Sequence, residues 1–203
     1  MRDFSDSPTP LAIARPRGAR LLQARSPKLG RLVQHYDRAS FQHWICLEAD
    51  PTVSAFCERP ACLSLEPTSQ LISYWVRRKE VDEFVMLVAH EVSVALPDKH
   101  DGKSMRTVTA TELNAAAVWI DNWQRMLPVI NCAATLAPPA LKQSILDLVS
   151  TPIALMALER ELCKAQPMLL RAAIFDLLRT GGICAPSLRT ERLSLHTILE
   201  PVQ

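Results

Sequence analysis

Acidic residues that could hold a divalent metal surround one apolar run in the middle of the chain. Asp82 and Glu83 precede the run FVMLVAH, and Glu91 follows it. Metal-dependent hydrolysis needs carboxylates that converge on one ion, commonly with a lysine that stabilises charge. The DGK triplet at 101–103 has suitable residue types, but it lies in a glycine turn, where ligands are not held rigidly. Asp82, Glu83 and Glu91 are therefore the catalytic candidates, with solvated strand ends as the simpler interpretation.

Two other chemistries can be weighed from the cysteines and histidines. His43 and Cys46 share a helix face, as zinc ligands often do, and Cys57 and Cys62 could complete a set of four. There is no CxxC pair, however, and isolated cysteines at apolar positions are usually small core residues. Five glycines leave little room for a glycine-rich phosphate loop. We therefore expect no metal site and no cofactor, with magnesium required only if a nuclease site is present.

The first half of the chain has the pattern of a mixed α/β domain. Apolar spacing over 40–49 predicts a helix, which Asp50-Pro51 ends because the residue before proline is disfavoured in helical conformation. Short β-like runs follow, and the nearly continuous apolar one is typical of a strand buried on both faces. We expect strands over 53–57, 61–65, 71–77 and 84–90, a continuation over 91–96, a turn at 66–69 and a loop over 97–104.

Helical spacing dominates the second half. We expect helices over 111–127, from Pro138-Pro139, from Pro152, and over 167–180 with Gly181-Gly182 as the C-cap. Residues 183–199 have the pattern of two short strands around a polar turn. Helices followed by strand–turn–strand are the order of a winged helix, in which 167–180 is the recognition helix and 183–195 the wing. The alternative is an amphipathic helix and a hairpin that pack on the first domain.

Length and composition exclude several classes of protein. The 203 residues are 48% hydrophobic and 22% charged, as in globular proteins. No apolar run approaches the roughly 20 residues that span a bilayer, and the N-terminal residues lack the apolar core of a secretory signal. Six cysteines without dense pairing are typical of reduced thiols. The sequence therefore predicts a cytoplasmic protein that does not associate with membranes.

Positive charge is concentrated at the N-terminus. The chain carries a net charge of +2, yet residues 1–38 contain eight basic residues and three acidic ones. A basic, proline-rich arm is a common means of contacting a phosphate backbone, and arginine suits phosphate better than lysine does. The alternative is a solvated tail. The candidate DNA-binding residues are the basic ones of this segment and of the predicted winged helix: Arg15, Arg17, Arg20, Arg25, Lys28, Arg31, Arg171, Arg179, Arg189 and Arg192.

Several stretches resemble TnsA, the endonuclease subunit of heteromeric transposases. Asp50-Pro51-Thr52-Val53 and Glu58-Arg59-Pro60 are similar to that family's D-P-x-V step and E-Q-P turn. ATELNAAAVWIDNWQRML and LLRAAIFDLLRTGGICAPSLRTERLSLHTIL are similar to a later helix and to its closing helix, glycine and hairpin. The resemblance covers most of residues 25–199. It implies an arm (1–25), a restriction-endonuclease-like α/β domain (26–109) and a helical, winged-helix-like domain (110–203).

The resemblance also implies an active site, and the residues of that site are not carried over. In the family, the first domain cuts DNA at a transposon end with magnesium, and the second contacts partner transposition proteins. The helix glutamate falls at Ser40, with Gln42 beside it. The strand carboxylate falls near 73–76, which holds no acid, and the following strand at 84–90 offers only His90. Loss of these carboxylates removes the charge balance and water positioning of a metal site.

The sequence therefore predicts a DNA-associated subunit of a TnsA-like transposition complex from a mobile element, with a degenerate nuclease core. Its expected partners are DNA and the transposase and ATPase subunits of that complex. Two alternatives stay open. One is an active, metal-dependent endonuclease with relocated acids at Asp82, Glu83 and Glu91. The other is a protein–protein adaptor in which the basic arm is a flexible tether.

Overall fold

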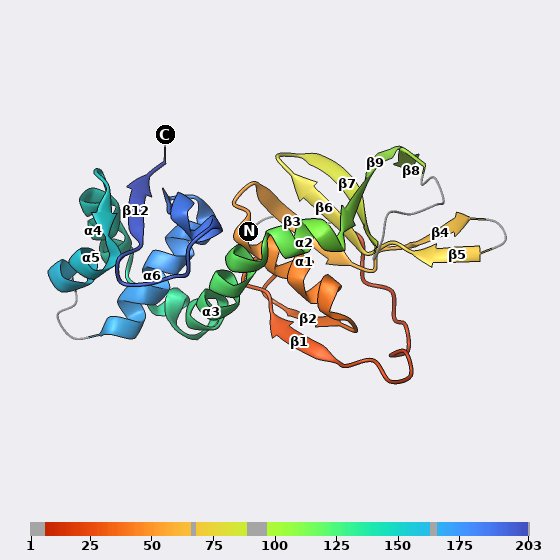
Figure 1. The fold of residues 1–203 in the computed structure, drawn as a ribbon, viewed down its shortest axis with the longest axis horizontal. Helices are drawn as coiled ribbons and strands as arrows, with labels where there is room; N and C mark the ends of the chain where they lie inside the picture. Colours follow the sequence, from red (N-terminus) through yellow and green to blue (C-terminus); the bar gives the residue numbers. More distant parts are fainter. Residues whose placement is uncertain (1–6, 66–67, 89–96, 163–165, 203) are drawn as a thin grey trace. The chain divides into compact units, whose positions relative to one another are not determined.

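The chain folds into two compact units. The computed structural model describes residues 7–65, 68–88, 97–162 and 166–202 (Figure 1). The first unit comprises the residues up to Leu47 together with Thr52–Ala115. The second comprises Glu48–Pro51 and the residues from Ala116 onward. The predicted boundary after residue 109 lies one short helix before this division.

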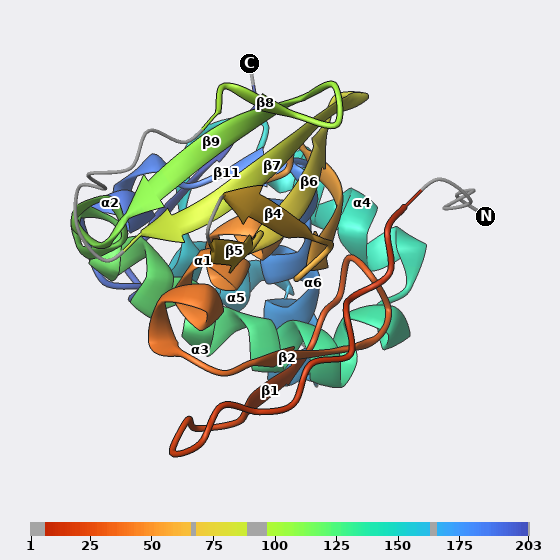
Figure 2. The ribbon, with the colours of Figure 1, turned by 90° about the vertical axis from the view of Figure 1, so that its right-hand side faces the viewer.

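A five-stranded mixed sheet is the centre of the first unit (Figure 2). The first three strands in its order form an antiparallel meander, the fourth is parallel to the third, and the fifth is antiparallel to the fourth. In spatial order the strands are β3 (Val53–Glu58), β6 (Tyr74–Arg78), β7 (Val81–Val88), β9 (Lys103–Thr109) and β8 (Lys99–His100).

The predicted strands are present with shifted ends. The strand predicted at 53–57 is confirmed by β3, and the one at 61–65 by β4 (Cys62–Leu65). The strand predicted over 71–77 is instead divided between β5 (Thr68–Leu71), which pairs with β4, and β6. The apolar strand predicted at 84–90 begins at Val81 and is described as far as Val88, and residues 89–96 lie outside the described residues.

The loop predicted over 97–104 is wrong, because a hairpin forms there. Strands β8 and β9 are joined by Asp101-Gly102, whose φ angles of 50° and 74° are both left-handed. Two-residue hairpin turns of this kind match the twist of the flanking strands and favour an acid or amide followed by glycine. The sequence DG was therefore a hairpin signal and not only a loop signal.

Both faces of the meander are buried. Trp75, Phe84 and Met86 pack in a core cluster on one face, together with side chains from the β4–β5 hairpin. Successive strand residues point to opposite faces, so Tyr74 lies on the other face. There its ring contacts His43 of helix α1 (Arg38–Ala49), with centroids 5.2 Å apart. Burial on both faces explains why the sequence of β7 lacks an apolar–polar alternation.

Helix α1 and the hairpin before it are fixed by local contacts. Asp37 accepts hydrogen bonds from the backbone N–H and the hydroxyl of Ser40, both at 2.7 Å, which caps the helix N-terminus. The helix predicted at 40–49 is thus confirmed, with a start at Arg38. Upstream, β1 (Leu22–Arg25) pairs with β2 (Leu32–His35). The last four residues of the predicted arm therefore form a strand.

One predicted helix is divided between the units. The helix predicted over 111–127 consists of α2 (Ala110–Ala115) and α3 (Ala117–Ala133), which are separated at Ala116. A capping box starts α2: the Thr109 hydroxyl accepts the Glu112 N–H at 3.1 Å, and the Glu112 carboxylate accepts the Thr109 N–H at 2.7 Å.

In the second unit, helices pack around α6 (Pro167–Thr180). A small three-stranded sheet of order β10-β12-β11 belongs to the same unit. The helices predicted from Pro138-Pro139 and over 167–180 are confirmed, and Gly181 caps the latter with a φ of 75°. The helix expected from Pro152 begins three residues later, after a short strand. The remaining elements are η1 (Ala134–Leu136), α4 (Pro139–Leu148), β10 (Ile153–Ala154), α5 (Leu155–Leu162), β11 (Ile183–Cys184), η2 (Pro186–Arg189) and β12 (Ile198–Pro201). Across the described ranges, every helix is too short or too polar to cross a membrane.

Candidate functional site

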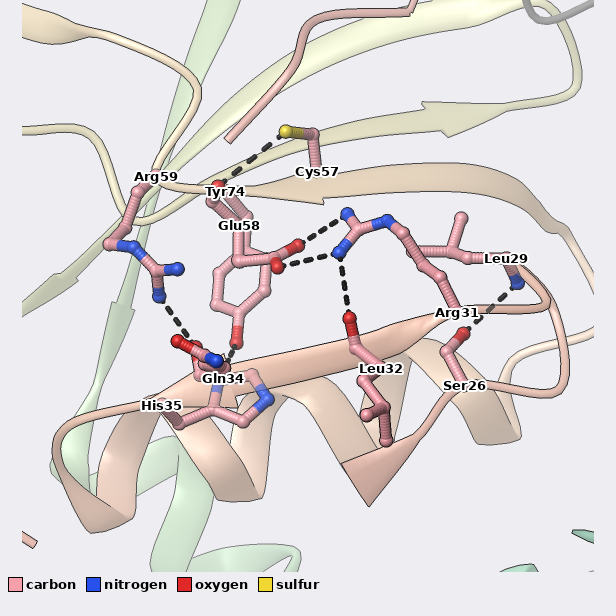
Figure 3. Close-up of polar contacts among 10 residues, drawn as sticks. All are labelled: Ser26, Leu29, Arg31, Leu32, Gln34, His35, Cys57, Glu58, Arg59 and Tyr74. Atoms are coloured by element: carbon pink, nitrogen blue, oxygen red, sulfur yellow. Dashed lines mark hydrogen bonds and ion pairs between the residues drawn. The ribbon is translucent and has the colours of Figure 1, made fainter. Parts of the chain in front are cut away.

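A buried ion pair lies at the end of β3 in the first unit (Figure 3). Glu58 is only 3% exposed, and its carboxylate accepts two hydrogen bonds from the Arg31 guanidinium, at 2.7 and 2.6 Å. Arg31 also donates to the carbonyl of Leu32 at 3.2 Å. The hydrogen bond with Glu58 raises the pKa of Arg31. A charge taken out of water needs such pairing, so this pair is a structural requirement of the buried acid.

A second polar group is centred on the Tyr74 hydroxyl. Tyr74 is 1% exposed, and its hydroxyl donates to the carbonyl of Ser40 at 2.7 Å and lies 3.0 Å from Nδ1 of His35. Because a phenol has one proton, the bond to Ser40 leaves His35 as the donor through Nδ1–H. Burial raises the pKa of Tyr74 well above its ordinary value. The group is therefore neutral and internally hydrogen-bonded.

The resemblance to TnsA would place acids at Ser40, in α1, and within residues 73–76, at the start of β6. The hydroxyl of Tyr74 donates to the backbone carbonyl of Ser40. A phenol and a backbone carbonyl meet there, and the Ser40 hydroxyl is bonded to Asp37. Ser73 accepts the N–H of Leu87 at 2.9 Å through its hydroxyl. The third position, His90, lies outside the described residues.

The catalytic candidates on β7 are not brought together. Asp82 and Glu83 are successive strand residues and so point to opposite faces. The carboxylate of Asp82 is held by Arg77 at 2.7 Å, and that of Glu83 by Arg78 at 2.9 Å. The hydrogen bond from Arg77 lowers the pKa of Asp82. Glu91 lies outside the described residues.

His43, Cys46, Cys57 and Cys62, which were considered as zinc ligands, do not form a metal-binding group. In the part of the chain that the structure describes, no three His, Cys, Asp or Glu side chains are placed to share a metal. His43 faces the Tyr74 ring, and Cys46, Cys57 and Cys62 are not joined in disulfide bonds. Burial raises the pKa of Cys57 to about 12, which disfavours the thiolate that metals bind.

Four of the basic candidates have short polar contacts within the protein. Lys28 donates to the carbonyls of Leu47 and Val53 at 2.8 and 2.9 Å, and Arg31 is bound to Glu58. In α6, Arg171 pairs with Glu159 at 2.5 Å, and Arg179 pairs with Asp176 at 2.6 Å. Residues 172–178 of the predicted recognition helix are all buried, so the middle of α6 has no exposed face for a groove.

The remaining basic candidates present exposed side chains. Arg189 lies over the ring of Trp119, with its guanidinium carbon 4.7 Å from the ring centroid. Arg192 follows in the same loop and is exposed. Four more lie on the N-terminal segment and are exposed as well: Arg15, Arg17, Arg20 and Arg25. These six side chains are exposed, as is that of Arg171, which pairs with Glu159.

Two positioning residues escaped the sequence reasoning. Asn122 is fully buried in α3, and its amide donates to the carbonyls of Leu188 and Glu191 and accepts the N–H of Leu193, all at 2.8 Å. An asparagine inside an apolar helical stripe is a signal that could have identified it, because buried amides need partners. The other is Arg59, whose side chain donates to the carbonyl of Gln34. No local pattern marks that contact.

Stability should fall as the pH drops from about 6.5 toward 4, because His35 and His43 are buried. Burial lowers the pKa of His35 to about 4 and, together with Arg106 and Arg78, that of His43 to about 3. The unfolded chain then binds more protons than the folded chain below pH 6.5, so each histidine contributes stability that is present above that pH and lost on acidification. The expected slope is roughly 1.4 kcal/mol per pH unit for each histidine.

Urea titrations between pH 7 and pH 4 measure this slope. His43→Leu should flatten the fall relative to the wild type, whereas His196→Gln, at an exposed position, should leave it unchanged. A His43→Leu profile parallel to that of the wild type would contradict the assignment.

Comparison with models of known protein families gave no match, and no curated protein matched the sequence. What the chain can do is therefore inferred from its own contacts. Tyr74 and Ser40 are joined by a buried hydrogen bond, and Asp82 and Glu83 of β7 are each paired with an arginine. Exposed arginines lie on the N-terminal segment and between β11 and β12.

Proposed function

We propose that this chain is a DNA-associated subunit of a TnsA-like transposition complex, in which the nuclease-like first unit is a scaffold and does not cut DNA. The observation that carries the proposal is the contact between Tyr74 and Ser40. The resemblance would place a helix acid at Ser40 and a strand acid within residues 73–76, and a 2.7 Å hydrogen bond joins the Tyr74 hydroxyl to the backbone carbonyl of Ser40.

Metal-assisted cleavage needs charged oxygens and room for water at the Ser40–Tyr74 position. Hard divalent cations select carboxylate, carbonyl and water oxygens, and catalysis needs an open coordination position. The buried Tyr74 hydroxyl is neutral and already donates its proton, and the Ser40 hydroxyl is bonded to Asp37. A neutral phenol at this position supplies no charged oxygen to a divalent ion.

The arrangement of both units supports the proposal. A helix followed by an antiparallel meander and a parallel strand is compatible with a restriction-endonuclease-like domain. In the second unit, α5 and α6 are followed by β11, the 3-10 helix η2 and β12, with β11 and β12 antiparallel, which keeps the helix and strand order of a winged helix. Because the middle of α6 is buried, this order supports the domain type and not DNA reading by α6. The exposed arginines supply the charge for DNA association.

An active nuclease with relocated acids has less support. Asp82 and Glu83 would each have to leave an arginine and turn to a common face of the sheet, which the strand geometry prevents. A protein–protein adaptor without DNA affinity is the other alternative. It gives no role to three exposed arginines in a stretch of chain that contains no acid.

We expect the purified protein to bind a transposon-end duplex and to leave it intact in magnesium or manganese. The physical reason for the lack of cleavage is that Asp82 and Glu83 are each paired with an arginine and point to opposite faces of the sheet. Gel retardation measures binding, and denaturing electrophoresis of the same samples measures nicking. Metal-dependent nicking that Glu83→Ala or Glu91→Ala abolishes would establish the nuclease alternative, and absence of binding would favour the adaptor.

A further inference from the structure

The basic N-terminal segment is fastened to the sheet of the first unit. The N–H of Leu11 donates to the carbonyl of Arg59 at 2.9 Å, and the hydroxyl of Tyr36 donates to the carbonyl of Ile13 at 3.4 Å. The guanidinium of Arg59 lies over the Tyr36 ring, 5.1 Å from its centroid, and donates to the carbonyl of Gln34. We call Arg59 and Tyr36 the clasp, because each bonds a different point of the segment.

The clasp is itself anchored in the sheet. Arg59 follows β3 directly, and its N–H donates to the carbonyl of Ser73, just before β6, at 2.9 Å. Its φ of 51° is left-handed, a conformation that non-glycine residues rarely adopt. The backbone N–H of Arg59 is therefore bonded to the sheet, and its carbonyl is bonded to the N-terminal segment. A flexible tether would not be held in this way.

Beyond the clasp, the chain turns back on itself. We call residues 14–21 the basic loop. The N–H of Ala19 donates to the carbonyl of Pro16 at 3.0 Å, and Gly18 has a φ of 80°. The returning chain enters β1, and Figures 1 and 2 show the turn extending past the end of that strand.

The basic loop presents exposed positive charge. Arg15, Arg17 and Arg20 are exposed, and among the described residues none of the three takes part in an ion pair. Residues 7–36 contain no acidic residue. A stretch with only one sign of charge suits a uniformly anionic polymer better than a protein surface of mixed charge.

We propose that the clasp holds the basic loop as a preformed element in which Arg15, Arg17 and Arg20 bind the phosphate backbone of duplex DNA. The inference rests on the proposed function and names the surface that performs it. Guanidinium groups donate two hydrogen bonds to one phosphate, and fixing the loop beforehand reduces the ordering cost of binding. Arg59 is a positioning residue, because it acts through the loop and its own side chain is bonded to Gln34.

Fluorescence anisotropy with a labelled duplex over a range of salt concentrations tests the proposal. Arg15→Ala/Arg17→Ala/Arg20→Ala should weaken binding on the order of 100-fold and lower the slope of log affinity against log salt by about 3. Lys79→Ala/Lys99→Ala/Arg160→Ala removes the same charge from exposed positions elsewhere and should have a much smaller effect. The positioning role is tested by Arg59→Lys, which keeps the charge but loses the planar stack. It should weaken binding about 5- to 10-fold with the salt slope unchanged, and speed hydrogen exchange at the Leu11 amide.

The outcomes separate the loop assignment from the proposed function. If the wild type binds DNA and the arginine triple variant binds as tightly as its charge-matched control, the loop assignment is wrong and DNA association survives. If Arg59→Lys lowers the salt slope, Arg59 contacts phosphate directly and is not a positioning residue. Equal affinity of the wild type for poly-glutamate and for the duplex would assign the loop to acidic proteins instead. A wild type that binds no DNA overturns both proposals.

Discussion

Arg31→Met is expected to lower the free energy of unfolding by about 3 kcal/mol, because it leaves the carboxylate of Glu58 buried without a partner. The Glu58 side chain is 4% exposed and the Arg31 side chain 38% exposed. This loss of stability is at the low end of the range for breaking a buried ion pair, because the Arg31 side chain is partly exposed to water. Urea denaturation at neutral pH, followed by tryptophan fluorescence, measures it.

The two partners of this pair should not be equivalent. Glu58→Gln should cost less than Arg31→Met, because the freed guanidinium can turn toward solvent whereas the freed carboxylate cannot. Arg31→Met/Glu58→Leu should recover part of the loss, since an apolar pair of similar volume often replaces a buried ion pair without cost. Arg17→Met is the matched control at an exposed position. A stability of Arg31→Met within about 0.5 kcal/mol of the wild type would show that the pair is not structural.

Asn122→Ala is expected to cost about 2–4 kcal/mol and to release the loop between η2 and β12. The side chain satisfies three backbone groups of residues 188–193 at 2.8 Å each, in a site with no exposure. Alanine cannot replace those bonds, and each buried polar group left without a partner costs about 1–3 kcal/mol. Water that enters the site and bonds to these groups would reduce the total. Thermal unfolding gives the stability, and hydrogen exchange at the Leu193 amide reports the loop.

The matched control for Asn122 is Asn114→Ala, at an exposed position of α2. It should change stability by less than about 0.5 kcal/mol. A Leu193 amide that stays protected in Asn122→Ala would mean that other contacts hold the loop. In that case Arg189, which lies over Trp119, would be the remaining anchor on α3.

Elements with local signals were predictable from the sequence. Pro167 begins α6 and Gly181 ends it, because proline is pre-organised for the first helical turn and glycine adopts the left-handed C-cap without strain. Strand β3 follows Pro51 where the β-branched and aromatic residues begin. Each of these signals acts within a few residues, so no tertiary information is needed.

Elements that depend on distant partners were not predictable. The helix expected over 111–127 is divided at Ala116, which carries neither glycine nor proline to mark a break. Lys28 was a candidate for phosphate contact, yet its ammonium group donates to carbonyls 19 and 25 residues away. Such partners are neighbours only after the sheet and α1 have assembled.

In the candidate site, too, some features follow from the sequence and others only from the tertiary structure. The sequence by itself determined that positions 40 and 73–76 hold no carboxylate, because residue identity needs no fold. Only the tertiary structure decided that the Tyr74 hydroxyl bonds to the Ser40 carbonyl, and which arginines are exposed. Arg31 and Arg15 are both basic residues in an acid-free segment, but Arg31 lies opposite the buried end of β3, where Glu58 requires a counter-charge. Arg15 lies on a turn beyond the clasp, exposed to solvent, where no such requirement acts.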